Sequence, residues 1–224
     1  MADFEEQTAS AKLGDFIGRN KKCFITLLVL VICFLIGLVI GVSVSSNNKV
    51  KGLQALDEIA HEMTQKSSDL EDAEIATRLS TAFEKAEPYT KKGGIVGARA
   101  NMLCADITYQ QNKFQESADF WKAAAEKSKK SYIAPLAYFN VGACYEELGN
   151  LDEAAANYMI ASDFDTFVMR SHAMFSYGRV LETQGKYAEA VAAYKDLNSN
   201  FPDDSWANLA KSRIIALQNE GKAE

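Results

Sequence analysis

An internal repeat is the feature that most restricts what this chain can fold into. The middle copy, at 141–161, reads VGACYEELGNLDEAAANYMIA, and it aligns without gaps with YGRVLETQGKYAEAVAAYKDL at 177–197, an offset of 36 residues. A weaker copy, CADITYQQNKFQESADFWKAA, lies at 104–124, which is 37 residues before the middle one. Repeats with a period of about 34 to 37 residues are typical of stacked helical pairs. We therefore expect an all-α solenoid of antiparallel helix pairs.

Each copy alternates small and large residues in the way that two packed helices require. Where the first helix of a pair must pass close to the second, the chain has a small residue: Ala105, Gly142 or Gly178. Where the chain must reverse, it has a residue that tolerates positive φ: Asn112, Gly149 or Gly185. The second helix of each pair carries an aromatic residue: Trp121, Tyr158 or Tyr194. The pattern predicts that each aromatic side chain packs beside a small residue of the neighbouring helix.

These residues closely resemble the tetratricopeptide repeat family, whose signature has a small residue at position 8, Tyr at 11, Gly at 15, Ala at 20, an aromatic at 24 and Ala at 27. The middle copy matches this signature with Gly142, Tyr145, Gly149, Ala154, Tyr158 and Ala161. The last copy departs from it at Leu181 and Leu197, and the first copy has Asn101 where an aromatic residue is usual. The spacings of 36 and 37 residues also exceed the usual 34, so we expect longer linkers around the middle pair.

A second constraint is the run from Cys23 to Ser46, which has no charged side chain over 24 residues. As a helix, at about 1.5 Å per residue, it spans about 36 Å and can cross a hydrocarbon core of about 30 Å. A cleaved signal peptide has a shorter apolar region of about 7–15 residues. We therefore expect one membrane-spanning helix at 23–46.

The residues that flank this run predict its orientation. Four bases precede it closely and two follow it: Lys12, Arg19, Lys21 and Lys22, then Lys49 and Lys51. Positive charge favours the cytoplasmic side, so the tail is expected inside and the repeats outside. Gly37, Gly41 and Ser45 recur every four residues within the run. They share one helix face, where another membrane helix can approach closely.

The expected organisation follows from these signals. Its parts are a short cytoplasmic tail at 1–22, the membrane helix at 23–46, a divergent helical pair with a connector at 49–97, three repeats within 98–202 (approximately 98–131, 135–168 and 171–204) and a capping helix at 205–219. The divergent pair is expected at 53–65 and 70–86, and the glycines of 93–97 are expected to form a flexible connector. Prolines fall at expected segment boundaries: Pro88, Pro135 and Pro202.

Composition and spacing disfavour several functions. Residues 49–224 carry 20 Lys and Arg against 26 Asp and Glu, whereas nucleic-acid binding needs a basic face. His61 and His172 are the only histidines, and no second ligand stands at a zinc-site spacing from either. Cys104 and Cys144 are expected to be buried free thiols, because Cys packs as a small hydrophobe. We expect no enzyme, no metal and no cofactor.

The resemblance also implies where a protein ligand would bind. In the tetratricopeptide repeat family, fixed positions of each first helix line a concave groove. Here those positions hold Arg99, Met102, Asp106, Tyr109, Gln110, Leu136, Phe139, Ala143, Glu146, Glu147, His172, Phe175, Arg179, Glu182 and Thr183. Aromatic and apolar patches interrupted by acids suit an extended or helical protein segment.

The whole layout is similar to the bacterial ancillary SecYEG translocon subunit family of YfgM type. That resemblance implies a non-catalytic adaptor that holds translocating proteins or periplasmic chaperones near the export channel. Two alternatives stay open. One is an envelope assembly scaffold for cell-wall or outer-membrane machinery, whose terminal repeat and cap the segment 198–214 resembles. The other is a regulatory subunit of a membrane enzyme, docked through the face of Gly37, Gly41 and Ser45.

Overall fold

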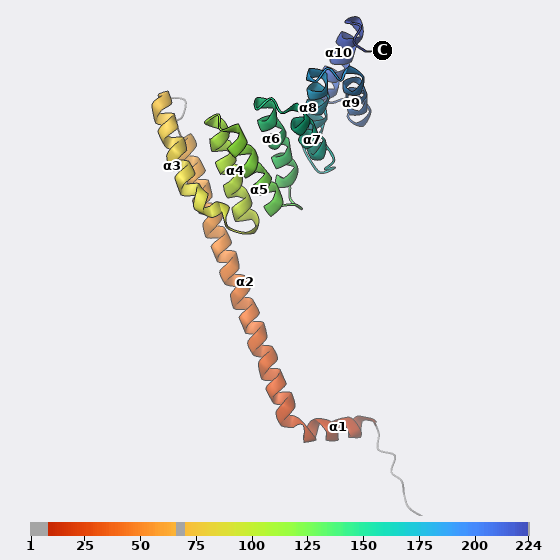
Figure 1. Cartoon of the computed structure of the whole chain (residues 1–224). Coiled ribbons are helices and arrows are strands. Elements are labelled where there is room, and N and C mark those ends of the chain that lie inside the picture. The colour runs from red at the N-terminus through yellow and green to blue at the C-terminus, as the bar shows by residue number, and fades with distance from the viewer. Residues whose placement is uncertain (1–8, 66–69, 224) are drawn as a thin grey trace, which may run out of the picture. The chain divides into compact units, whose positions relative to one another are not determined.

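The computed structural model describes residues 9–65 and 70–223, with side chains from residue 12 onward. Within these ranges every regular element is a helix, and there are ten of them (Figure 1). The chain divides into two compact units, Met1–Lys51 and Gly52–Glu224. Of the expected tail at 1–22, residues 1–8 lie outside the described part.

The first unit contains α1, Ala9–Arg19, and most of α2, Lys21–Thr64. The uncharged run lies inside α2, and every residue from Lys21 to Lys51 is exposed. Among the described residues, α2 is the one helix long and apolar enough to cross a membrane. It does not end with the apolar run but continues to Thr64, so the separate helix expected at 53–65 is part of α2. No proline separates the two segments, so the backbone hydrogen bonds of the helix can continue through Asn47 and Asn48.

The second unit is the expected all-α solenoid. Its helices after α2 are α3 Asp72–Thr90, α4 Gly94–Gln110, α5 Phe114–Lys127, α6 Ile133–Glu147, α7 Leu151–Ser162, α8 Arg170–Thr183, α9 Tyr187–Asn200 and α10 Ser205–Asn219. Each of these helices packs against the next one along the chain (Figure 1). The repeats correspond to the pairs α4/α5, α6/α7 and α8/α9.

The join between α3 and α4 differs from the sequence expectation. The helix continues through Pro88 to Thr90, and α4 begins at Gly94, within the glycine stretch expected to be a connector. Gly94 has φ +59°, and Gly97 is buried. A Cβ on Gly97 would collide with the carbonyl oxygen of Lys92. These two glycines therefore permit a tight turn and a close backbone approach, which a flexible linker would not need.

The expected small-to-aromatic packing is confirmed in the second and third repeats. A Cβ added at Gly142 would lie 2.8 Å from Cε1 of Tyr158, and one at Gly178 would lie 2.6 Å from Cε1 of Tyr194. Both tyrosine rings are buried. Real Cβ atoms do not approach other heavy atoms this closely. The two helices of each pair can therefore pack at this distance only because the first helix has a glycine at the contact.

The reversal residues are also confirmed. Asn112, Gly149 and Gly185 have φ of 59°, 73° and 75°. After each of them, the next N–H donates to the carbonyl five residues earlier, as Asn150 does to Tyr145 over 2.9 Å. This bond is typical of a helix that ends in a left-handed residue, and it satisfies a carbonyl that the helix leaves open.

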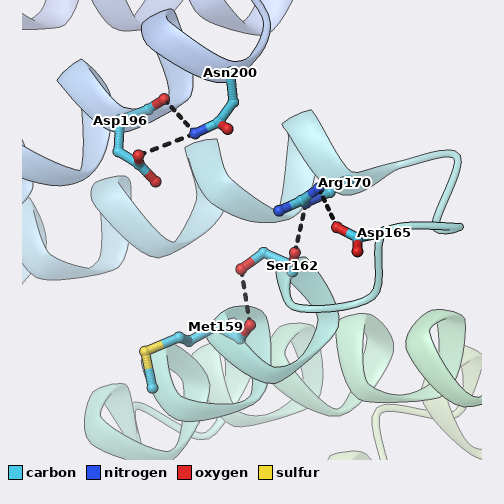
Figure 2. A network of polar contacts seen from close by, with 6 residues as sticks. All are labelled: Met159, Ser162, Asp165, Arg170, Asp196 and Asn200. Carbon is cyan, nitrogen blue, oxygen red and sulfur yellow. Dashed lines mark hydrogen bonds and ion pairs between the residues drawn. The ribbon is translucent and has the colours of Figure 1, made fainter.

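The linker after the middle repeat is seven residues long, from Asp163 to Met169, and Arg170 bonds to the residue before it and to a residue within it (Figure 2). The Arg170 Nε–H donates to the Ser162 carbonyl over 2.7 Å, at the last residue of α7. Its Nη1 also donates to Oδ1 of Asp165 over 2.7 Å, inside the linker. Because Arg170 is the first residue of α8, these bonds tie the start of the third repeat to the end of the second.

Replacing Gly178 by Val is expected to lower the free energy of unfolding by about 1–3 kcal/mol, the usual cost of overpacking a filled core. The Tyr194 ring cannot retreat without giving up the bond from its hydroxyl to Glu182. Denaturant unfolding of the two proteins measures the difference. Ala156→Val is the matched control, because Ala156 is exposed on α7 and Val there loses at most about 0.7 kcal/mol of helix propensity. An equal loss in both variants would contradict the close contact.

Candidate functional site

Contacts between successive first helices bring the expected groove positions together. From α4 to α6, the Tyr109 hydroxyl donates to Oε1 of Glu147 over 3.2 Å. From α6 to α8, the rings of Phe139 and His172 lie 4.8 Å apart. We call the surface formed by the first helices the groove. It has an aromatic part and a polar part.

The aromatic part is a cluster that runs from α6 to α10. The His172 and Trp206 rings are stacked, with centroids 3.8 Å apart and planes within 5° of each other. The Phe175 ring lies 5.2 Å from Trp206, and Phe139 contacts His172 on its other side. Phe139 and Phe175 are only 9% and 6% exposed. These two rings therefore form the floor of the groove, while His172 and Trp206 are half-buried and partly exposed to solvent.

The polar part is a ladder in which one motif occurs twice. Glu146 accepts a 2.6 Å bond from the Tyr158 hydroxyl and a fork of two 2.6 Å bonds from the Arg179 guanidinium. One repeat later, Glu182 accepts a 3.1 Å bond from the Tyr194 hydroxyl and a fork from the Arg213 guanidinium. Each carboxylate thus joins the second helix of its own pair to the next first helix. A bidentate pair between an arginine and a carboxylate fixes the relative orientation of the two side chains, in addition to the attraction between their charges.

The electrostatics of the ladder keep its hydroxyls as donors. Burial, followed by the hydrogen bond to Glu146, raises the pKa of Tyr158 well above the ordinary tyrosine value. Burial and the Glu182 charge raise the pKa of Tyr194 in the same way. Both phenols stay protonated throughout the physiological range, so the ladder keeps these two bonds at any pH within it.

Solvent exposure divides the expected groove residues into three groups. Exposed are Asp106, Gln110, Glu147, Arg179 and Thr183. Half-buried are Arg99, Met102, Tyr109, Leu136, Ala143, Glu146, His172 and Glu182. Buried are Phe139 and Phe175. Arg99 stands apart from the others, because its guanidinium pairs with Asp57 of α2 over 2.7 Å at the opposite end of the solenoid from α10.

The contacts of α10 go beyond the sequence expectation. The sequence places Trp206, Leu209 and Arg213 in a capping helix, yet Trp206 joins the aromatic cluster and Arg213 joins the ladder. The sequence contains a spacing that identifies these positions. They follow His172, Phe175 and Arg179 at a constant spacing of 34 residues, the usual period of the family. The groove positions alone, without the small and aromatic core positions, therefore identify α10 as a further first helix after α4, α6 and α8.

The groove has a hollow of about 290 Å³ at its α8–α10 end. It is lined by Phe175, Arg179, Glu182, Thr183, Tyr187, Tyr194, Arg213 and Lys222. Its three cations are all engaged: Arg179 and Arg213 bind the ladder glutamates, and Lys222 pairs with Glu220 over 2.7 Å. An anion in the hollow would therefore compete with glutamates of this chain for these cations.

The described residues show where the potential metal ligands and the cysteines of the sequence lie. No group of three or more His, Cys, Asp or Glu side chains in the described ranges is placed to hold a metal ion. Cys104 and Cys144 are free and buried, as expected. Burial raises the pKa of Cys104 to about 12 and also raises that of Cys144, so both stay as unreactive thiols.

The predicted membrane-helix face lies along one side of α2. Gly37, Gly41 and Ser45 line a shallow hollow of about 640 Å³ together with Phe34, Leu38, Val42, Ser46 and Lys49. A Cβ added at either glycine would meet nothing within 4 Å. This face has room for a second backbone at close range.

Replacing Asp106 by Asn is expected to stabilise the protein slightly at pH 7. Asp106 reaches solvent, but the surrounding protein displaces part of its water, and this desolvation raises its pKa from 3.8 to about 6. The folded state therefore binds the proton more tightly than the unfolded state, so the wild type gains stability as the pH falls from about 6 to about 4. Asn carries no charge and has no such dependence.

Thermal melts of both proteins at several pH values measure this effect. The Asp106→Asn variant should melt above the wild type at pH 7, and the difference should close as the pH falls to about 4. A difference that stays constant across this range would contradict the raised pKa.

Comparisons with known proteins agree with this architecture. Residues 15–221 match the family described as tetratricopeptide repeat-like domain, so the match includes the apolar helix as well as the repeats. A TPR repeat-containing protein of Treponema pallidum (strain Nichols) is 34% identical over 151 residues, which are 67% of this chain and 61% of that protein. The aligned region thus spans less than two thirds of the relative's length. By its matched sequence and its stacked helix pairs, the chain belongs to the tetratricopeptide repeat-like domain family of protein-interaction modules.

Proposed function

We propose that this chain is a non-catalytic, membrane-anchored adaptor that binds a protein segment in its groove. The observation that carries the proposal is the continuity of the groove. The aromatic contacts from Phe139 to Trp206 and the ladder from Glu146 to Arg213 cross α6, α8 and α10 without a break. A surface that is this regular over several repeats fits an elongated ligand better than a small molecule.

The exposed chemistry of the groove indicates the kind of segment it takes. Met102 and Leu136 give apolar contacts beside the aromatic floor. Asp106 and Glu147 are exposed acids on the first helices α4 and α6. The ligand is therefore an extended or helical segment with apolar anchors, which also carries basic groups to face these acids.

The anchor and its direction are part of the proposal. Helix α2 crosses a bacterial inner membrane once, and the bases before it hold the N-terminus in the cytoplasm. The solenoid then lies on the extracytoplasmic side. Together with the resemblance to the ancillary SecYEG translocon subunit family of YfgM type, this placement supports a role that links the export channel to periplasmic chaperones.

Other partners would make use of the same surfaces. An envelope assembly scaffold would use the groove for cell-wall or outer-membrane components. A regulatory subunit of a membrane enzyme, or a homo- or hetero-oligomer, would instead use the open face of Gly37, Gly41 and Ser45. The bound partner decides among these roles.

Photoreactive residues in the intact chain test the groove in living cells. Gln110 and Thr183 are exposed on first helices, whereas Ala156 and Lys195 are exposed on second helices. We expect crosslinked partner from the first pair of sites to exceed that from the second pair by about tenfold, since a groove ligand covers only the first helices. Mass spectrometry of the crosslinked bands identifies the partner.

The identity of the crosslinked protein then selects the role. Translocon or chaperone subunits support the export adaptor, and wall or outer-membrane assembly proteins support the scaffold. A membrane enzyme captured equally well after Gly37→Ile and Gly41→Ile would remove the docking role of that face. Equal crosslinking from first and second helices would contradict the groove itself.

The orientation predicts a simple protection pattern. With an epitope added after Glu224, protease applied to spheroplasts should remove the epitope, and protease applied to inverted membrane vesicles should not. A cytoplasmic protein in the same samples reports whether the membranes stayed sealed. Protection in spheroplasts with cleavage in inverted vesicles would place the solenoid inside and reverse the proposed direction.

A further inference from the structure

Helix α1 carries an apolar stripe that no part of the described protein covers. Leu13, Phe16 and Ile17 are 60%, 57% and 47% exposed. Residues spaced by three and four lie on one face of a helix, so the three side chains form a single ridge. Three large apolar side chains on an eleven-residue helix, open to water, need a covering surface.

The charged residues of this segment indicate what that surface is. Between residues 12 and 22 the chain has four bases, Lys12, Arg19, Lys21 and Lys22, against the single acid Asp15. Asp15 lies on the side of α1 opposite the apolar ridge, because each residue advances about 100° around a helix. An apolar ridge flanked by bases complements a membrane surface that holds anionic headgroups.

The connection to α2 places this ridge at the end of the membrane helix. Asn20 is the one residue between α1 and α2, and its side-chain amide donates to the Phe16 carbonyl over 2.9 Å. The ring of Phe16 packs edge-to-face on Phe24, with centroids 6.0 Å apart. Phe24 belongs to the uncharged run, so the ridge of α1 is continuous with the apolar surface of α2. In Figure 1, α1 turns away from the axis of α2 at this point.

We propose that α1 is an interfacial helix that lies in the headgroup region of the membrane, with Leu13, Phe16 and Ile17 inserted among the acyl chains. The bases Lys12, Arg19, Lys21 and Lys22 then bind anionic lipid headgroups. This inference rests on the proposed membrane anchor α2. It assigns the residues before the anchor a lipid-binding role in place of a simple solvated tail.

The full-length protein in lipid vesicles tests the placement. Phe16→Trp puts a fluorophore on the ridge, and Asp15→Trp puts one on the opposite side of α1. The vesicles contain phosphatidylcholine with or without phosphatidylglycerol, and bromine atoms near the headgroup end of the acyl chains quench nearby tryptophans. Subtracting the wild-type signal removes the contribution of the native Trp121 and Trp206.

We expect quenching at position 16 to exceed that at position 15 by about threefold or more, because only the ridge reaches the acyl chains. Replacing both Lys12 and Arg19 by Gln should reduce the extra quenching that phosphatidylglycerol produces. Equal quenching at both positions in a protein that resists alkaline carbonate extraction would overturn this inference and leave the anchor intact. Release of the protein by carbonate would overturn the anchor and this inference together.

Discussion

The close contact between a first-helix glycine and a second-helix tyrosine ring is the constraint on which the rest of the solenoid depends. Because Gly178 has no Cβ, the Tyr194 ring can lie against the backbone of α8. The hydroxyl of that ring then donates a hydrogen bond to Glu182 over 3.1 Å, and Glu182 also accepts two hydrogen bonds from the Arg213 guanidinium of α10. Packing inside one pair thus orients the carboxylate that ties the pair to its neighbour. The register of the groove is therefore set by the core beneath it.

How much the sequence predicts depends on how local each requirement is. The reversal residues Gly149 and Gly185 are predictable, because a left-handed turn depends on the few residues around it. The small-to-aromatic contacts repeat within one pair and are predictable for the same reason. The burial of Phe139 is not predictable in this way, because it depends on Phe167 in a long linker and on His172 in the next repeat. A repeat signature names the position of a groove residue but does not say how its neighbours will cover it.

The start of the solenoid shows a different limit. Glycine occurs both in flexible connectors and where backbones touch, and only the neighbour distinguishes the two uses. At Gly97 that neighbour is the Lys92 carbonyl, and the local sequence does not indicate this close approach. Pro88 indicates a helix boundary, yet it lies in the last full turn of α3, where the helix ends soon afterwards at Thr90. Proline therefore marks the neighbourhood of the end but not the residue at which the helix stops.

Helix α10 determines how long the groove is. It makes the contacts of a first helix, since Trp206 stacks on His172 and Arg213 binds Glu182. It lacks the cover of a second helix: Ile215 is 57% exposed, whereas Leu181, at the same place in α8, is 3% exposed beneath α9. In the described residues after α10, 220–223, no further helix follows to cover Ile215. A helix expected only to close the core thus also extends the row of first helices by one repeat, to α4, α6, α8 and α10, with Trp206 on the same surface as His172.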